Sequence, residues 1–369
     1  EKNIMYINGD YVCFSNTSIM EYCLATYATV DQTLYDLMTA KGNRVNFAHE
    51  LSFYSGIVQD CSKLLNSLND EITATILENM DILDKIEKLS IGIEFNMGKK
   101  EFTEAIISSR CSIEEIDEME EVLPTNKETS PMEITKISSI EESESFMDLL
   151  LIYGNVIKNA ETIDKNQKKI HLENYMFGMN FQFGLIMNEF SVYLTSKTKE
   201  DLPEQLKEKH PNLTDEEYKK IKENVLDLLK IVLPVAIQFS LVDNVGTPKL
   251  EVVINELIQA NKDKKFTRFM LSFLLCDISN GNIKTFLRNY INEENSKDIL
   301  KLILAKLGFY YDMWYFGNNP QMDNILLDLI AETQIKLSDE NSLQLQVKKD
   351  EFKKQIKQQH DAQRKKLAS

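Results

Sequence analysis

Apolar residues recur three and four positions apart along most of the chain, as they do on one face of an α-helix. Residues 33–111 have this spacing, for example at Leu34, Leu37 and Met38, and we expect a helical subdomain there. Residues 146–346 have it more densely, and we expect a C-terminal helical array. The helices expected in this array cover residues 147–156, 172–194, 218–232, 250–258, 268–277, 300–311 and 324–335. Short connectors without a repeat of fixed period favour an all-α antiparallel helical array or an irregular α-solenoid.

Residues 1–32 follow a different pattern. Within residues 5–14, two short β-type runs lie on either side of Asn8-Gly9, which is a strong signal for a β-hairpin. Ser18 and Glu21 then have the spacing of a capping box, so we expect a helix to begin there. A small hairpin that leads into a helix is typical of the end of a winged-helix-like element. No complete domain fits before this hairpin, and we expect the chain to be the downstream part of a longer protein.

Two segments stand out by their charge. Residues 112–145 are rich in Glu and Asp and contain Pro124 and Pro131, which predicts an acidic linker or loop, because this composition cannot form a core. Residues 347–369 have the opposite sign, and we expect a basic tail helix that is either solvated or binds a polyanion. The candidate polyanion-binding side chains are Lys348, Lys349, Lys353, Lys354, Lys357, Arg364, Lys365 and Lys366.

Composition agrees with a helical protein. The chain of 369 residues has 12 Gly and 7 Pro, too few for the many turns of a sheet protein. Its net charge of -16 argues against binding to nucleic acid or anionic membrane, except through the basic tail. The five cysteines have no metal-binding spacing and are typical of a reducing cytoplasm. The most apolar stretch, Leu228–Val242, is shorter than the roughly 20 residues of a membrane span, so we expect a soluble cytoplasmic protein.

The sequence motifs of common active sites are not found. Gly98–Glu101 has neither the glycine spacing nor the Ser or Thr of a P-loop. His49-Glu50 resembles the start of a zincin motif, but Phe53 stands where the second His is required. No Gly-x-Ser-x-Gly elbow occurs. We therefore expect no catalytic residue, no metal and no cofactor in this chain, while an enzyme with a dispersed site stays open as an alternative.

An aromatic cluster lies at residues 309–317, where the only Trp of the chain is found with two Phe and three Tyr. Clusters of this kind fill the core at helix ends, and they also form the hot spots of protein interfaces. The candidate partner-binding residues are Tyr310, Tyr311, Trp314, Tyr315 and Phe316.

The run Phe14-Ser15-Asn16-Thr17-Ser18-Ile19-Met20-Glu21-Tyr22 resembles the end of the winged-helix domain in STAND-type signalling ATPases. In that family an aromatic residue is followed by Asn-Pro-Ser, an aliphatic residue and an acidic-aromatic pair. Here Thr17 replaces the usual Pro, and Cys23-Leu24 continue the helix as in the family. The close resemblance is limited to this region, and the helical remainder fits the family only in its general pattern.

Members of that family combine an effector domain, a P-loop ATPase module, a winged helix and a helical sensor array, often in antiphage defence or programmed cell death. The resemblance implies that this chain supplies the end of the winged helix and the array. ATP binding, effector catalysis and homo-oligomerisation would then belong to an upstream region. The implied partners are a protein trigger, such as a phage- or stress-derived molecule, and the ATPase module itself.

Two functional hypotheses follow from these observations. The leading one is a non-catalytic sensor and regulatory region that recognises a trigger and controls an upstream ATPase and effector. The alternative is a helical protein-interaction scaffold unrelated to ATPases, in which the hairpin is incidental.

Overall fold

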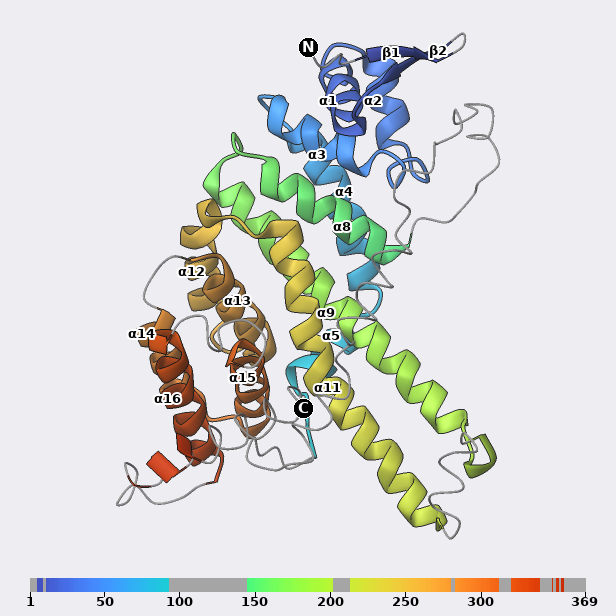
Figure 1. Cartoon of the computed structure of the whole chain (residues 1–369). Coiled ribbons are helices and arrows are strands. Elements are labelled where there is room, and N and C mark those ends of the chain that lie inside the picture. Colours follow the sequence, from blue (N-terminus) through green and yellow to red (C-terminus); the bar gives the residue numbers. More distant parts are fainter. Residues whose placement is uncertain are drawn as a thin grey trace. The chain divides into compact units, whose positions relative to one another are not determined.

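Helices form nearly all of the regular structure in the computed structural model of this chain (Figure 1). The structure describes residues 5–8, 11–92, 145–201, 213–279, 283–311 and 320–338, together with residues 347, 350, 351, 353 and 354. The all-α class expected from the sequence is confirmed. The predicted acidic linker lies outside the described residues except for Ser145.

The chain divides into two compact units. The first comprises residues 1–93 and 143–283, and the second comprises residues 94–142 and 284–369. The helices of the first unit are α1 (Thr17–Ala28), α2 (Gln32–Thr39), α3 (Ala48–Ile57), α4 (Ser62–Leu77), α5 (Met80–Glu87), α8 (Phe146–Asn159), α9 (Lys165–Ser196), α11 (Asp215–Val245), α12 (Glu251–Ala260) and α13 (Lys265–Ile278). Two short 3-10 helices, η2 (Lys199–Asp201) and η3 (Pro248–Leu250), also belong to it.

A two-stranded hairpin precedes these helices. Strands β1 (Met5–Asn8) and β2 (Tyr11–Phe14) pair in an antiparallel manner, with Met5 opposite Phe14 and Asn8 opposite Tyr11. The predicted hairpin is therefore confirmed as a pair of strands, and Gly9 of the predicted turn lies outside the described residues. Whether the hairpin and α1 belong to a winged helix stays a prediction.

The start of α1 differs from the capping box predicted at Ser18 and Glu21. The side chain of Asn16 is the N-cap, and its Oδ1 accepts a hydrogen bond from the Ser18 amide at 2.8 Å. Asn satisfies this first-turn amide as well as Ser does, so the N-cap lies two residues before the predicted one.

Helices from both predicted helical segments pack together in the first unit. α4 lies against α8 and α9, and α5 lies against α9 and α13. The carboxylate of Glu87, at the end of α5, accepts the amides of Phe266 and Thr267 at 3.0 and 3.1 Å and so caps α13. The predicted boundaries at residues 33–111 and 146–346 therefore differ from the observed units, because such contacts join segments that are far apart in sequence.

Two glycines allow α9 to approach its neighbours closely. A Cβ atom at Gly184 would lie 2.2 Å from Ile82 Cγ2 and 2.7 Å from Ile86 Cδ1, both on α5. A Cβ atom at Gly178 would lie 2.5 Å from Leu150 Cδ2 on α8. Since real Cβ atoms do not come this close to other atoms, the helix spacing at these two points depends on glycine.

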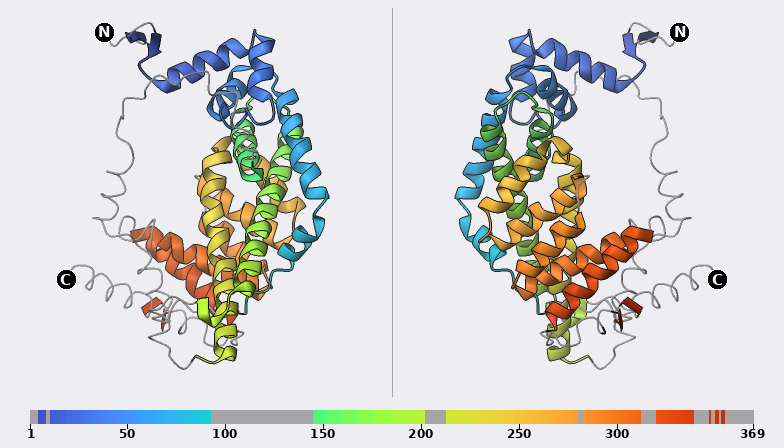
Figure 2. Two further views of the ribbon diagram at one scale, coloured as in Figure 1. Left: turned by 90° about the vertical axis from the view of Figure 1, so that its right-hand side faces the viewer. Right: turned by 90° about the vertical axis from the view of Figure 1, so that its left-hand side faces the viewer.

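The long helices α9 and α11 lie side by side, and both extend away from α4 and α8 (Figures 1 and 2). α11 is longer than the predicted helix at 218–232. It starts at a capping box formed by Thr214 and Glu217 and continues through the buried Pro234 to Val245. The charged first turns lack strong apolar spacing, and proline normally ends a helix, so the sequence favoured a shorter element.

The second unit contains α14 (Ile283–Glu293), α15 (Lys297–Phe309) and α16 (Pro320–Leu337). α15 packs against α16 through buried Leu and Ile side chains. Arg288 of α14 forms a bidentate ion pair with Glu332 of α16, with N···O distances of 3.0 and 2.9 Å. Lys336 Nζ donates to the carbonyl oxygens of Ile291 and Asn292, so its charge lies at the C-terminus of α14, where a cation is favoured.

Candidate functional site

The paired ends of α9 and α11 form a two-helix projection that we call the arm, comprising residues 185–196 and 214–233 (Figure 2). Lys199 Nζ lies 2.6 Å from Asp215 Oδ1 near the tip. Lys222 Nζ donates to the Lys197 carbonyl at 3.3 Å and lies 4.9 Å from the centroid of the buried Tyr218 ring. These contacts hold the two helices together near the tip of the arm.

The exposed side of α11 is apolar along three turns. Ile221, Val225, Leu228 and Val232 are 41, 38, 39 and 49 % exposed, respectively. Their spacing of four, three and four residues places them in one row along the helix. We call this row the α11 stripe. Single exposed apolar residues are common on protein surfaces, but a contiguous row is typical of a contact surface.

The edge of the α11 stripe that faces away from α9 has a polar, uncharged residue at its middle. Asn224 is exposed there and is a helical neighbour of Ile221 and Leu228. Two carboxylates lie near this edge. That of Glu217, one turn before Ile221, accepts the Thr214 amide at 2.9 Å in the capping box, and that of Asp227, three residues after Asn224, accepts the Gly92 amide at 2.7 Å. Asn224 is therefore a polar but neutral neighbour of the stripe.

The charged side chains in the same turns of α11 point elsewhere. Lys219 Nζ lies 3.9 Å from Glu223 Oε1, and both residues belong to the side of the helix opposite the stripe. Lys222 lies at the α9 edge of the stripe, where its ammonium group is directed to the Lys197 carbonyl. These positions leave the row itself apolar.

The opposite side of α11 is tied to the chain that follows α5. Asp227 Oδ2 accepts the Gly92 amide at 2.7 Å, and Lys230 Nζ donates to the Ser90 carbonyl at 2.8 Å. Lys230 also pairs with Asp227 at 2.7 Å, and Ile91 between these partners is buried. These contacts fix the face of α11 that points away from the stripe.

α11 is also the one helix among the described residues that is long and apolar enough to cross a membrane. An 18-residue window of this 31-residue helix has a mean hydropathy of 2.0, and 28 % of the window is buried. The helix extends beyond Leu228–Val242 at both ends, and the expectation that the chain has no membrane span stays a prediction. Core helices of soluble proteins pass the same criterion, so length and composition alone are weak support for a span.

A buried polar cluster joins α4, α8 and α9. The Tyr153 hydroxyl donates to Asn69 Oδ1 at 3.0 Å and lies 2.8 Å from His171 Nδ1. Because the single hydroxyl hydrogen goes to Asn69, we assign the neutral Nδ1–H tautomer to His171, which then donates to Tyr153. Burial lowers the pKa of His171 and raises the pKa of Tyr153, so both groups stay neutral near pH 7.

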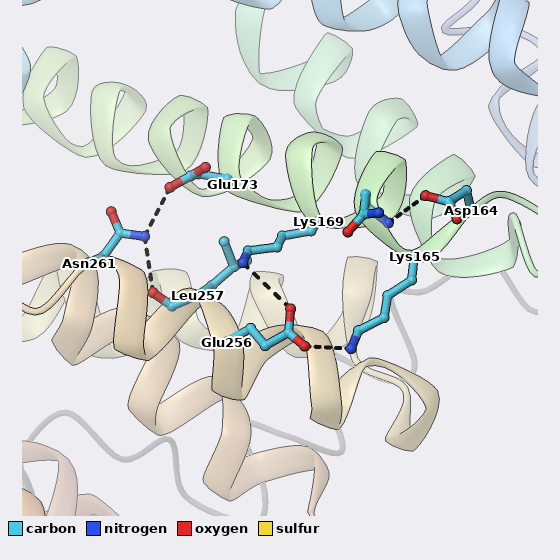
Figure 3. A network of polar contacts seen from close by, with 8 residues as sticks. Asp164, Lys165, Lys169, Glu173, Glu256, Leu257 and Asn261 are labelled. Carbon is cyan, nitrogen blue, oxygen red and sulfur yellow. Dashed lines mark hydrogen bonds and ion pairs between the residues drawn. The ribbon is translucent and has the colours of Figure 1, made fainter.

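A second polar network connects α9 with α12 (Figure 3). Glu256 of α12 lies between Lys165 and Lys169 of α9, forming an ion pair with Lys165 and lying 3.5 Å from Lys169. Asn261 Nδ2 donates to Glu173 Oε1 and to the Leu257 carbonyl, both at 3.0 Å. The contacts of Glu256 with Lys165 and Lys169 and of Asn261 with Glu173 cross from α12 to α9, so the network holds α12 on α9.

A small pocket of about 210 Å³ lies between α2, α3 and α4 and is lined in part by Tyr35, Tyr54, Cys61 and Lys63. The Tyr35 and Tyr54 rings are 5.2 Å apart, and Lys63 Nζ lies 5.0 Å from the Tyr35 ring centroid. Burial raises the pKa of Cys61 to about 11 and that of Tyr35 to about 12. A thiol with such a pKa is protonated near pH 7 and is a poor nucleophile.

The residues predicted from the aromatic cluster divide into two groups. Tyr310 and Tyr311 are buried, which agrees with the interpretation of this cluster as core, and Lys306 Nζ lies 4.8 Å from the Tyr310 ring centroid. Trp314, Tyr315 and Phe316 lie outside the described residues.

Among the predicted polyanion-binding residues, Lys353 is half-exposed and forms an ion pair with Asp328 of α16, and Lys354 is exposed. The positive charge of Lys353 is therefore paired with a carboxylate of the same unit. The remaining candidates, Lys348, Lys349, Lys357, Arg364, Lys365 and Lys366, lie outside the described residues.

Sequence reasoning did not find the α11 stripe. Its four residues belong to a stretch in which apolar residues occupy most faces of the helix, including Leu226, Leu229 and Ile231. A helix that is apolar on all sides is normally read as buried. The sequence did contain a signal that this helix is partly exposed. Lys and Glu occur in the same turns as the apolar residues, and a core helix does not tolerate these charges.

Within the described ranges, no group of three or more His, Cys, Asp or Glu side chains could hold a metal ion. Comparison of the sequence and the structure with protein-family models, with curated proteins and with solved structures finds no match.

Proposed function

We propose that this chain is a non-catalytic interaction region, and that it contacts another protein molecule through the α11 stripe. The proposal rests on the exposure of four apolar side chains, from Ile221 to Val232, on successive turns of one helix. Association that covers these side chains removes apolar area from water, which is the dominant favourable contribution in most protein–protein association.

The stripe is presented on a supported helix. Pairing with α9 fixes one side of α11, and the contacts of Asp227 and Lys230 with residues 90–92 fix another. A surface that is already ordered loses less conformational entropy when a partner binds, so such a helix is suited to recognition.

The more specific form of the proposal is the sensor array of a STAND-type signalling ATPase. It is supported by the resemblance of Phe14–Tyr22 to the end of the winged helix in that family. In this role the cytoplasmic helical region recognises a trigger, such as a phage- or stress-derived molecule, and controls an upstream ATPase and effector. The alternative is a helical scaffold unrelated to ATPases that uses the same stripe.

Site-specific photo-crosslinking in cells tests the interaction surface. A photoreactive amino acid at position 225 should form a crosslink to one defined protein, and the same amino acid at Val252, which is 59 % exposed on α12, should not form it. The crosslinked protein is identified by mass spectrometry and purified. Its binding to the chain and to the Val225→Gln/Leu228→Gln variant is then compared. Equal binding by both would show that the stripe is not the contact surface.

A second test separates the sensor from the scaffold. The genomic reading frame that contains this chain should encode a P-loop, Gly-x-x-x-x-Gly-Lys followed by Ser or Thr, upstream of the hairpin if the sensor form is right. A reading frame without any P-loop would leave only the scaffold form.

A further inference from the structure

We propose that the molecule bound at the α11 stripe is a second copy of this chain, with the two α11 helices antiparallel across a two-fold axis. The inference rests on the proposed function and names the partner. The spacing of the stripe is the first argument. Its intervals of four, three and four residues read the same in both directions, so an antiparallel copy places Ile221 opposite Val232 and Val225 opposite Leu228. A two-fold interface requires this reciprocity of contacts.

The shape of the stripe allows such a pairing. From Ile221 to Val232 it extends about 16 Å, at 1.5 Å per residue, along one helix. A row of this length matches the ridges and grooves of a second helix of three turns. The copy of the stripe supplies a helix of that length with an exposed apolar row of its own.

Asn224 supplies the second argument. The two-fold axis passes between residues 226 and 227, so Asn224 and its copy lie on the same edge of the helix pair. They are displaced by only about 7 Å along the helix axes, at 1.5 Å per residue. An exposed residue at this position faces its own copy, and Lys or Glu there would repel the like charge across the axis. The neutral amide of Asn224 avoids this repulsion.

Glu217 and Lys220 are charged residues near the N-terminal end of the stripe, and each lies far from its own copy in this arrangement. Glu217 and its copy are separated by about 28 Å along the helix axes, and Lys220 and its copy by about 20 Å, at 1.5 Å per residue. Such distances exceed the Debye length of about 8 Å at physiological salt. The like charges of these two pairs therefore do not oppose the pairing at short range. The Asp227 carboxylate lies close to the axis along the helix, but it is bound by the Gly92 amide and Lys230 on the face that points away from the stripe.

A lipid surface fits these observations less well. The charged side chains of Asp227 and Lys230 lie within the apolar part of α11, and both are held by contacts with residues 90–92. The match between the spacing of the row and that of its own copy gives no advantage in binding to a membrane.

Sedimentation equilibrium of the full chain tests the proposal. We expect a concentration-dependent dimer, and the Val225→Gln/Leu228→Gln variant should weaken it about tenfold or more, as truncation of central interface residues does. Val252→Gln removes an exposed apolar residue on α12 and should leave the dimer unchanged. Added salt should strengthen association, because it screens the repulsion between two chains that each carry a net charge of -16. Circular dichroism of each variant checks that helix content is retained.

Crosslinking of the purified chain tests the orientation. A photoreactive amino acid at position 221 should link to the tryptic peptide of residues 231–249, which contains Val232 and follows cleavage after Lys230. A parallel pair would instead link position 221 to the segment around residue 221 of the second copy. Such a result would overturn the antiparallel arrangement.

Charge variants at position 224 test the two-fold axis. Asn224→Glu and Asn224→Lys should each dimerise more weakly than the unchanged chain, because each variant faces its own like charge. An equimolar mixture of the two should associate several-fold more tightly than either variant alone, since opposite charges then meet. Position 224 is exposed, so neither change disturbs the core.

Several results would overturn the proposal. A chain that stays monomeric, or a dimer unaffected by the stripe variant, would exclude this interface. A crosslink in cells from position 225 to a different protein, without self-association of the chain, would support the proposed function. It would also show that the partner is not a second copy of this chain. Stripe-dependent binding to lipid vesicles by a monomeric chain would show that the stripe binds a membrane surface and not a second copy.

Discussion

At the scale of single residues, side chains that are distant in sequence satisfy the backbone ends of helices. Glu87 binds the first amides of α13, and Lys168 Nζ donates to the Ala160 carbonyl at the end of α8 at 2.8 Å. Lys336 does the same at the end of α14. Helix ends leave amides and carbonyls without partners in the helix, and charged groups of the right sign at these ends are favourable. The caps made by Glu87 and Lys336 have no local sequence signature.

The buried His171 leads to a prediction about pH. Its pKa is lowered by burial, so below the unfolded-state value of roughly 6.5 the unfolded chain binds a proton that the folded chain does not. The free energy of unfolding should therefore decrease as the pH falls from about 6.5 towards the folded-state pKa of His171. Urea unfolding at several pH values measures this decrease.

The control for this prediction is the other described histidine. His171→Gln should flatten the pH dependence of stability between about pH 7 and pH 5, whereas His49→Gln, at an exposed position, should leave it unchanged. If the two variants gave the same pH profile as the unchanged chain, His171 would not be the group that titrates.

At the scale of elements, close approach determines how α9 meets its neighbours. The sequence predicted a helix at 172–194, and the observed helix covers Lys165–Ser196. Its glycines contribute little to helix formation, since glycine costs roughly 1 kcal/mol relative to alanine in a helix interior. Gly178 and Gly184 are explained by the side chains of α8 and α5 that lie where a Cβ would be.

Gly184→Ala should therefore destabilise the protein. The new Cβ would lie 2.2 Å from Ile82 Cγ2, so α5 must shift, and overpacking of this kind costs roughly 1–3 kcal/mol. Gly56→Ala in α3 is the matched control, because its Cβ would meet nothing closer than 3.8 Å. Chemical denaturation should show loss of stability for the first variant and a gain of about 0.5–1 kcal/mol for the second. A stabilised Gly184→Ala variant would contradict the observed spacing of α5 and α9.

At the scale of the whole molecule, the first unit is assembled from two separate stretches of sequence. Residues 1–93 and 143–283 form one compact unit, in which Tyr153 of α8 binds Asn69 of α4 and Glu87 of α5 caps α13. The sequence placed a domain boundary in the acidic stretch between them. Helical periodicity predicts where helices are, but it does not state which helix packs on which.

Cleavage of the chain between the two stretches tests this assembly. A specific protease site introduced between residues 112 and 144 should yield two fragments that still elute together from a size-exclusion column, because their helices share one core. Mild urea should separate the fragments and unfold both at once. Fragments that separate in buffer alone, each with helical circular dichroism, would support the two independent helical domains that the sequence predicted.

The all-α class, the hairpin in residues 5–14 and the position of most helices were predicted from the sequence, because these depend on local periodicity and turn chemistry. Which side chains are buried depended on the packing of distant segments. Tyr310 and Tyr311 became core residues, whereas the four residues of the α11 stripe stayed exposed, although both sets belong to apolar helical stretches. The physical reason is that burial depends on which other elements reach a side chain, and contacts between distant segments are not encoded in local spacing.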